Sequence, residues 1–199
     1  MKKIRVPPML SDLLAETLLT CDGILFDRSS SCPYCGGDLF GYDVKERQFA
    51  VIIDDKQKRT IHVSVRRYCC RRCGKISYAD QPFYPGTRIG SPVVDLCVTL
   101  GEMMPYTRAA VYLAKAGIIV DRWSVRNYAR KGFRAGTDVE MFGIRLPASV
   151  VALSALVTAV QEGRYIDADG ILAACGYPSR VHPGNHQGAI FILDEQNSR

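Results

Sequence analysis

The clearest pattern in the chain is an alternation of apolar and polar residues near its middle. Ile61, Val63 and Val65 are apolar, and the residues between them are polar. This period of two is typical of a β-strand that buries one face. Residues 48–53 are also apolar and prone to form a strand, and a polar stretch at 54–58 separates the two runs. We therefore expect a β-hairpin with its turn within residues 54–58.

Helical patterns lie on both sides of this hairpin. Leucines recur three and four residues apart in the segment 8–20, which predicts an amphipathic helix. After the hairpin, the same criteria predict helices over residues 91–101, 105–117, 122–131, 147–161 and 167–174. Ser91 and Asp121 are residue types that favour N-caps, so we expect them to cap two of these helices. A final apolar run at 189–193 predicts a buried strand.

Four of the eight cysteines form two Cys-x2-Cys-Gly motifs, one on each side of the hairpin. The first contains Cys32 and Cys35, and the second contains Cys70 and Cys73. Each motif turns two thiolates toward one ion, and the glycine that follows accepts a left-handed backbone conformation. Four thiolates beside a hairpin predict a closed, structural Zn²⁺ site of the zinc-ribbon type.

Two alternatives to this ligand set stay open. The cysteines can form disulfides instead, which a reducing compartment disfavours. Cys69 adjoins Cys70 and is an alternative ligand with Cys-x3-Cys spacing, although the symmetry of the two motifs favours Cys70. Cys21, Cys97 and Cys175 lie among apolar neighbours, and we expect them to be buried thiols.

Composition excludes several classes of protein. Hydrophobic residues make up 47% and charged residues 23% of the chain, which excludes a disordered or collagen-like protein. No uncharged apolar stretch approaches the roughly 18 residues of a membrane-spanning helix, so we expect no membrane partner. The N-terminus lacks the apolar core of a secretory signal, and we therefore expect a cytoplasmic protein.

The formal net charge of +6 is concentrated in two blocks. Residues 56–75 contain eight basic and no acidic residues, and residues 105–134 contain seven basic residues and one acidic residue. Such blocks favour a polyanionic partner, because contacts of Lys and Arg with phosphate release counterions. The alternative is that the charge serves solubility alone. In the first block we expect phosphate contacts from one end of the hairpin domain, by Arg59, Arg66, Arg67, Arg71, Arg72 and Lys75.

The second basic block covers two short predicted helices, 105–117 and 122–131, joined by a turn that contains glycine. This is the arrangement of a helix-turn-helix, in which Val125 and Tyr128 would face inward. The outer face of the second helix then carries residue types that read base edges in the major groove, namely Arg122, Ser124, Arg126, Asn127 and Arg130. Trp123 fits either under the turn or against the sugar-phosphate backbone. Double-stranded DNA is the expected partner, and an ordinary three-helix bundle with a solvated basic face is the alternative.

Together these elements predict an α+β chain with four segments. Residues 1–31 hold the N-terminal helix, and residues 32–78 form a small zinc-ribbon domain. Residues 90–134 form a trihelical helix-turn-helix domain, and residues 145–199 form a mostly helical segment that ends in a strand. We expect the N-terminal helix to pack on the ribbon or on a second subunit, which leaves a homodimer open.

The combination of motifs resembles the N-terminal region of insertion-sequence transposases. The resemblance rests on the first cysteine motif, the hairpin, the basic second motif at 66–75 and the helices at 106–130, and it covers residues 32–132. Transposases of this kind place a zinc ribbon and a helix-turn-helix ahead of a DDE catalytic domain. The resemblance implies recognition of the terminal inverted repeats of a mobile element, that is, of a specific duplex site.

Asp194 follows the predicted strand 189–193 and is similar in position to the first Mg²⁺-binding carboxylate of a DDE domain. Because the chain ends at Arg199, two further carboxylates are missing, and we expect no catalysis by this chain. Asp194 and Glu195 can equally be a solvated strand end. The main alternative function is therefore a truncated Mg²⁺-dependent transposase whose core is missing or encoded separately. A zinc-ribbon module that binds protein or RNA is a third.

Overall fold

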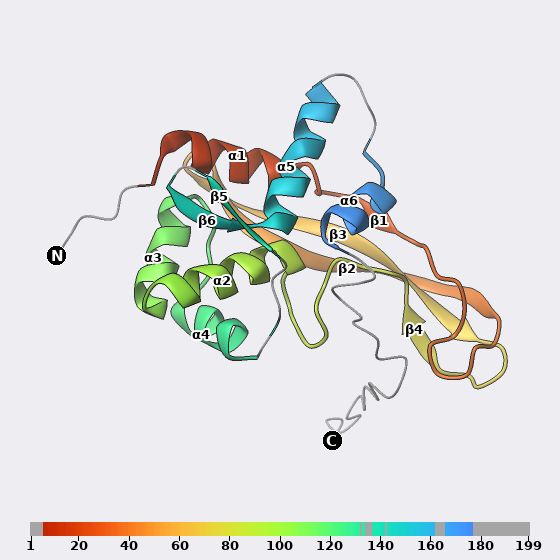
Figure 1. Ribbon diagram of the computed structural model, residues 1–199. Coiled ribbons are helices and arrows are strands. Elements are labelled where there is room, and N and C mark those ends of the chain that lie inside the picture. Colours follow the sequence, from red (N-terminus) through yellow and green to blue (C-terminus); the bar gives the residue numbers. More distant parts are fainter. Residues whose placement is uncertain (1–5, 132, 134–136, 142, 162–165, 177–199) are drawn as a thin grey trace.

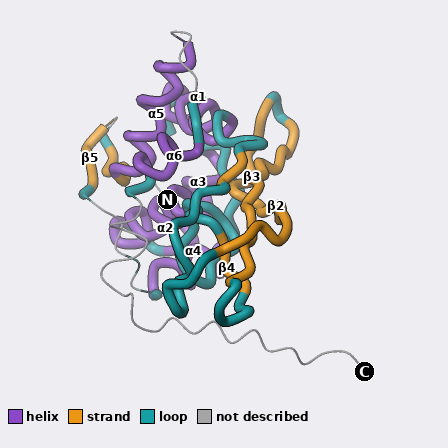
Figure 2. Tube along the Cα trace, turned by 90° about the vertical axis from the view of Figure 1, so that its right-hand side faces the viewer, coloured by secondary structure: helices purple, strands orange, loops and turns teal. Residues whose placement is uncertain are grey.

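The computed structural model describes residues 6–131, 133, 137–141, 143–161 and 166–176. It contains helices and two sheets, which confirms the expected α+β class. A long hairpin runs along one side of a group of helices (Figure 1). In the view along the hairpin in Figure 2, β2, β3 and β4 lie on the right and most helices lie to their left. The predicted strand 189–193, with Asp194 and Glu195, lies outside the described residues.

The hairpin consists of β2 (Leu39–Asp54) and β3 (Gln57–Cys70), and both strands are longer than the sequence pattern predicted. Its turn is shorter than expected. Only Asp55 and Lys56 connect the strands, with φ angles of 45° and 64°. Two such left-handed residues form the turn whose twist matches that of antiparallel strands.

β3 is paired along both of its edges. β2 lies on one side, and on the other side β1 (Leu25–Phe26) runs parallel to residues 64–65. Further along that second edge, β4 (Ile76–Tyr78) pairs antiparallel with residues 67–69. The predicted alternation is confirmed, because the apolar side chains at positions 61, 63 and 65 are all 0% exposed.

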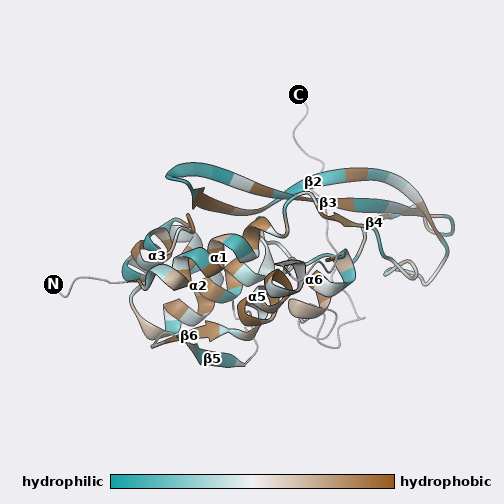
Figure 3. Cartoon of the chain, turned by 90° about the horizontal axis from the view of Figure 1, so that it is seen from above, coloured by the Kyte–Doolittle hydropathy of each residue, from teal (hydrophilic) through white to brown (hydrophobic). Residues whose placement is uncertain are grey.

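The helices cover the inner face of the hairpin. They are α1 (Pro8–Leu19), α2 (Ser91–Met103), α3 (Tyr106–Lys115), α4 (Arg122–Arg130), α5 (Ala148–Gln161) and α6 (Ala168–Ala174). α2 is buried along residues 91–100 and contacts α3, α4 and α5. α1 packs against α5 and β2 of the same chain. A second hairpin, β5 (Asp138–Met141) and β6 (Ile144–Pro147), was not predicted and lies across the helices from the long hairpin (Figure 3).

The start of α2 differs from the expectation. The N-cap residue is Gly90, and Ser91 is the first residue of the helix. A Cβ atom on Gly90 would lie 2.3 Å from the Phe49 ring, so only glycine allows this close approach of the helix to β2. The prediction that Ser91 caps the helix is therefore wrong, and its buried hydroxyl has no hydrogen-bond partner within the described residues.

The connection between α3 and α4 is hydrogen-bonded to the hairpin. The Ile119 N–H donates to the Val51 carbonyl at 2.8 Å, and the Ile53 N–H donates to the Gly117 carbonyl at 2.7 Å. Buried residues of the hairpin and of the helices belong to one continuous hydrophobic cluster. The segments 32–78 and 90–134 are thus joined both by main-chain bonds and by a shared core.

Candidate metal centre and nucleic-acid interface

The two cysteine motifs form the same backbone turn at the end of the hairpin opposite its two-residue turn. The Gly36 N–H donates to the Cys32 carbonyl at 2.8 Å, and the Gly74 N–H donates to the Cys70 carbonyl at 3.0 Å. Gly36 and Gly74 have φ angles of 68° and 70°, in the left-handed region that favours glycine. Because β2 begins opposite the end of β3, the two turns face each other.

The turns bring four sulfur atoms together. The Sγ atoms of Cys32, Cys35, Cys70 and Cys73 all lie within 4.8 Å of one another. Two of the separations are 3.6 Å (Cys32–Cys73) and 3.5 Å (Cys35–Cys70). A tetrahedral ion with Zn–S bonds of about 2.3 Å has sulfur–sulfur edges of about 3.8 Å. A disulfide bond is only about 2.05 Å long, so the four thiols are free and their arrangement fits a bound metal ion.

Two thiols of the cluster have pKa values that their neighbours shift in opposite directions. Backbone N–H groups of Cys73 and Arg72 stabilise the Cys70 thiolate and lower its pKa to about 6. Although the Gly37 N–H lowers the pKa of Cys35, desolvation and hydrogen bonds from neighbouring thiols raise it to about 12. One thiolate therefore forms readily and opposes the ionisation of its neighbour. A bound divalent cation would allow all four thiols to ionise, because it replaces the protons that the sulfurs share.

Cys69 is not part of the cluster. Its Sγ lies 3.5 Å from the Gly74 carbonyl oxygen. Adjacent residues of a strand point to opposite faces, so Cys70 turns toward the other sulfurs and Cys69 turns away. Of the two candidates for this position, Cys70 is the one that the backbone presents to the cluster. The isolated thiols Cys21, Cys97 and Cys175 are buried, as expected.

The basic residues beside the cysteine cluster fall into two kinds. Arg67 binds both carboxylate oxygens of Asp43, and this hydrogen-bonded pairing raises the arginine pKa above its ordinary value. Arg67 is therefore neutralised by a neighbour, which the sequence did not predict. Four others form no ion pair in the described part of the chain, and these are Arg66, Arg71, Arg72 and Lys75. All but the half-buried Arg66 are exposed.

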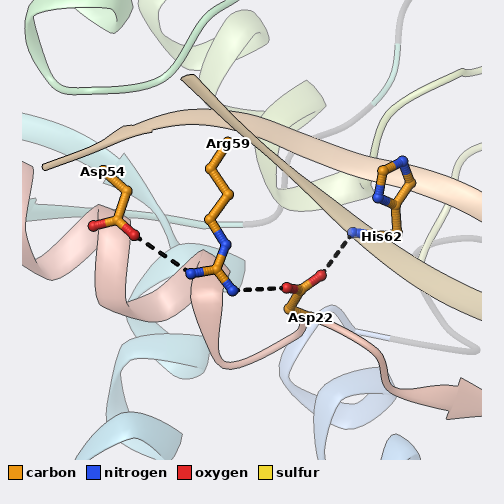
Figure 4. Close-up of polar contacts among 4 residues, drawn as sticks. All are labelled: Asp22, Asp54, Arg59 and His62. Carbon is orange, nitrogen blue, oxygen red and sulfur yellow. Dashed lines mark hydrogen bonds and ion pairs between the residues drawn. The ribbon is translucent and has the colours of Figure 1, made fainter. Parts of the chain in front are cut away.

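Arg59 does not belong to this group. It lies near the turn end of the hairpin, where its guanidinium is 3.0 Å from Asp22 and 3.4 Å from Asp54 (Figure 4). Asp22 also accepts a hydrogen bond of 3.0 Å from the His62 backbone N–H. Arg59 thus fastens the segment after α1 to β3, and the prediction that it lies with the basic residues at the cysteine end is wrong.

The N-terminus of α4 is capped as predicted. The Asp121 carboxylate accepts hydrogen bonds from the Trp123 N–H at 2.8 Å and from the Ser124 N–H at 3.0 Å. The Ser124 hydroxyl also donates to Asp121 at 2.6 Å. These bonds, led by that hydroxyl, lower the pKa of Asp121. The Ser124 hydroxyl proton is therefore engaged in the cap, and the structure does not leave it free to donate to a base.

The two faces of α4 differ as expected. Val125 and Tyr128 are 0% and 9% exposed and hold the helix against the core. On the outer side Arg122, Asn127 and Arg130 are exposed, and Arg126 is half-buried. The helix packs against both α2 and α3.

Trp123 lies on the surface rather than under the turn. Its side chain is 59% exposed, and the guanidinium carbons of Arg122 and Arg126 lie 5.1 and 5.6 Å from its ring centroid. These three residues line a shallow pocket together with residues 105–107 at the start of α3. Two arginines and an aromatic ring thus meet where α3 and α4 both begin.

Sequence reasoning missed a set of exposed aromatic rings at the cysteine end of the hairpin. Tyr34, Phe40, Tyr42 and Tyr78 are 38%, 41%, 56% and 41% exposed. Strand pairing brings these rings close to the basic second motif, so the sequence alone did not predict the arrangement. The aromatic residues between positions 34 and 42 are the signal that could have pointed to them.

No described helix is long and apolar enough to cross a membrane. Asp194, which was considered as a remnant of a DDE core, lies outside the described residues. Comparison of the chain with family models, curated proteins and solved structures finds no match in any of the three.

Proposed function

We propose that this chain is a Zn²⁺-containing, cytoplasmic DNA-binding protein that recognises a specific duplex site, such as a transposon end, without catalysis of its own. Cys32, Cys35, Cys70 and Cys73 hold the ion in a zinc ribbon. α3 and α4 act as a helix-turn-helix, with α4 entering the major groove. The ion is structural, because four thiolates leave no coordination position for water or substrate.

The observation that carries this proposal is the two-sided character of α4. One side is held in the core by Val125 and Tyr128, whereas the exposed or half-buried side chains of Arg122, Arg126, Asn127 and Arg130 lie on the other. Arginine pairs with guanine and asparagine with adenine in the major groove. The acidic residue next to these side chains, Asp121, is occupied by the helix cap.

The cysteine end of the hairpin supplies a second contact with the DNA backbone. Arg66, Arg71, Arg72 and Lys75 are free of ion pairs within the described residues and are suited to phosphate. Arg59, the partner of Ile52, and Cys70 are eleven positions apart along β3, which is about 36 Å of strand. Ile52 itself bridges to Ile118 just before α4. The α3–α4 connection and the cysteine end are thus attached to distant points of the same hairpin.

The test is a salt titration of binding. The purified chain loaded with Zn²⁺ is used to select sequences from a random 30-bp duplex pool, and affinities for the selected and the unselected duplex are then compared. With about six phosphate contacts, affinity should fall about 1000-fold between 50 and 200 mM salt, and the selected duplex should bind more tightly at every concentration. Arg126→Ala should reduce this preference.

Arg145→Ala is the control, because it also removes one arginine, an exposed one that lies on the β5–β6 hairpin. It should leave the preference for the selected duplex unchanged. Binding that is insensitive to salt, or a selection that yields no preferred sequence, would overturn the proposed function.

A further inference from the structure

One face of the sheet changes character along its length. Near the helices, the side chains at positions 61, 63 and 65 of β3 point into the core. Alternate residues of a strand share a face, so Arg67 and Cys69 continue the same face toward the cysteine end. Figure 3 shows that this end of the hairpin extends beyond the helices. The face that is core at one end is therefore uncovered at the other.

Strand pairing places aromatic rings on this uncovered face. Phe40 and Ile76 are the Cα partners of Cys69 on either side of β3, and Tyr78 is the partner of Arg67. Tyr42 lies at an irregularity of β2, and its ring also meets the Arg67 guanidinium, 5.5 Å from the centroid. Phe40 and Tyr42 of β2 thus flank Cys69 and Arg67 of β3 on one side, and Tyr78 of β4 flanks them on the other. Each of the three rings is about 40% exposed or more.

Basic side chains accompany these rings. The Arg67 guanidinium carbon is 6.0 Å from the Tyr78 centroid, and that of Arg71 is 5.4 Å from Phe40. On the neighbouring turn, Lys75 Nζ lies 4.7 Å from the centroid of Tyr34. Asp43, the Cα partner of Arg67, is on the same face, and its carboxylate is bound by that arginine, so the charges of the two side chains offset each other. The face is therefore aromatic, and Arg71 and Lys75 are its basic groups without an ion pair in the described part of the chain.

Of the possible occupants, this combination suits an unpaired nucleic-acid strand. Bases that are not paired expose flat π-faces, and they stack on aromatic side chains of a sheet while basic groups neutralise the phosphates. A duplex cannot use the rings in this way, because its bases are stacked on one another. An apolar protein partner would not need the cations Arg71 and Lys75 beside Phe40 and Tyr34.

We propose that the face formed by Phe40, Tyr42 and Tyr78 binds single-stranded DNA by stacking, with Arg71 and Lys75 neutralising its phosphates. This site is separate from α4 and goes beyond duplex recognition, because it needs no base pairs and none of the residues of α4. Its stacking residues are not used in the proposed duplex contact, whereas Arg71 and Lys75 would contact phosphates of either a duplex or a single strand.

The test measures binding of fluorescent 15-mer oligothymidylate to the full Zn²⁺-loaded chain by anisotropy. Tyr42→Ala should weaken binding about 5- to 150-fold, the range for loss of one stacked base, and Tyr42→Trp should retain it. Val44→Ala is the matched control on the same strand. Val44 pairs with Arg66 and so belongs to the opposite face, and its replacement should have no effect.

Three outcomes would overturn the proposal. The first is equal affinity of wild type and Tyr42→Ala at unchanged Zn²⁺ content. The second is tighter binding of the matched oligouridylate, which would assign the face to RNA. The third is absence of binding to either strand, which would leave it for a protein. Failure here is distinguishable from failure of the proposed function, because selection of a duplex by α4 and its loss in Arg126→Ala are measured separately.

Discussion

The Ile119 N–H donates to the carbonyl of Val51 across 2.8 Å and so joins the α3–α4 connection to the edge of β2. A second bond, from the Ile53 N–H to the Gly117 carbonyl, runs in the opposite direction at 2.7 Å. The helices that we propose to bind a duplex are thus attached to the strand whose far end lies beside the four clustered cysteines. These two bonds attach the α3–α4 connection, and with it the basic residues of α4, to the hairpin that carries the other basic residues.

The first prediction concerns this connection. Ile119→Pro removes the N–H that donates to Val51 and leaves the Val51 carbonyl without this hydrogen bond. The free energy of unfolding should therefore fall by about 1–3 kcal/mol. Ile119→Ala keeps the N–H, and because the side chain is 37% exposed, it should cost less. Urea denaturation of both variants and wild type measures the difference. Equal stability of the two variants would show that the bond contributes nothing.

Local features of the sequence predicted the local features of the fold. Asp121 caps α4 through hydrogen bonds to residues two and three positions later, and Val125 and Tyr128 are buried because helical periodicity puts them on one face. The cysteine motifs are equally local, since each turn is closed by a bond between residues four apart. The cap, the buried pair and the four sulfur donors could therefore be inferred without any tertiary information.

The errors arose where a distant residue decides the outcome. Gly90 replaces Ser91 as the N-cap because Phe49, far away in the sequence, leaves no room for a Cβ. Arg67 is neutralised by Asp43, which the hairpin register places beside it. The register also places Arg59 near the turn of the hairpin, because both strands are long and the cysteines lie at their other end. Charge blocks in the sequence do not contain this pairing information.

The second prediction tests the composition of the metal centre. Cys73→Ser removes one of the four clustered sulfurs and should reduce bound Zn²⁺ to well below one ion per chain. Cys69→Ser removes the neighbouring thiol, which lies outside the cluster, and should retain one ion per chain. Elemental analysis of both purified variants decides between them. A wild-type chain without metal, or loss of metal from Cys69→Ser, would contradict the assignment.

The third prediction concerns Gly37, which lies against the sulfurs. A Cβ at this position would be 3.2 Å from Cys70 Sγ, 3.3 Å from Cys35 Sγ and 2.9 Å from the Cβ of Arg72. Gly37→Ala should therefore displace the ligands and weaken Zn²⁺ binding, on the order of 10-fold. Gly41→Ala is the matched control, because its nearest contact is a flexible arginine tip at 3.6 Å. Competition with a chromophoric chelator measures both affinities.

The fourth prediction follows from the lowered pKa of Asp121, which is caused first by the Ser124 hydroxyl and then by backbone N–H groups. A carboxyl group with a lowered pKa in the folded state stabilises the fold above its ordinary pKa of about 3.9, and that contribution disappears as the pH falls through the lowered value. Asp121→Ala should cost about 1 kcal/mol at pH 7. In an NMR titration, the Asp121 carboxyl should show a midpoint below about 3.9, and a midpoint at or above it would contradict the cap.

The last prediction separates the two kinds of DNA contact that we propose. Asn127 is exposed on α4 and suited to adenine, so Asn127→Ala should lower the preference for the selected duplex by about 1–3 kcal/mol at one base position and change the salt dependence little. Arg72 is exposed at the cysteine end and suited to phosphate. Arg72→Ala should weaken selected and random duplexes alike, and should reduce the slope of log affinity against log salt by about one. Affinity measured for both duplexes at four salt concentrations gives both quantities for each variant. Base reading and phosphate neutralisation respond differently to salt. If both variants changed the preference for the selected duplex and the salt slope in the same proportion, α4 and the hairpin would therefore not have the distinct roles proposed for them.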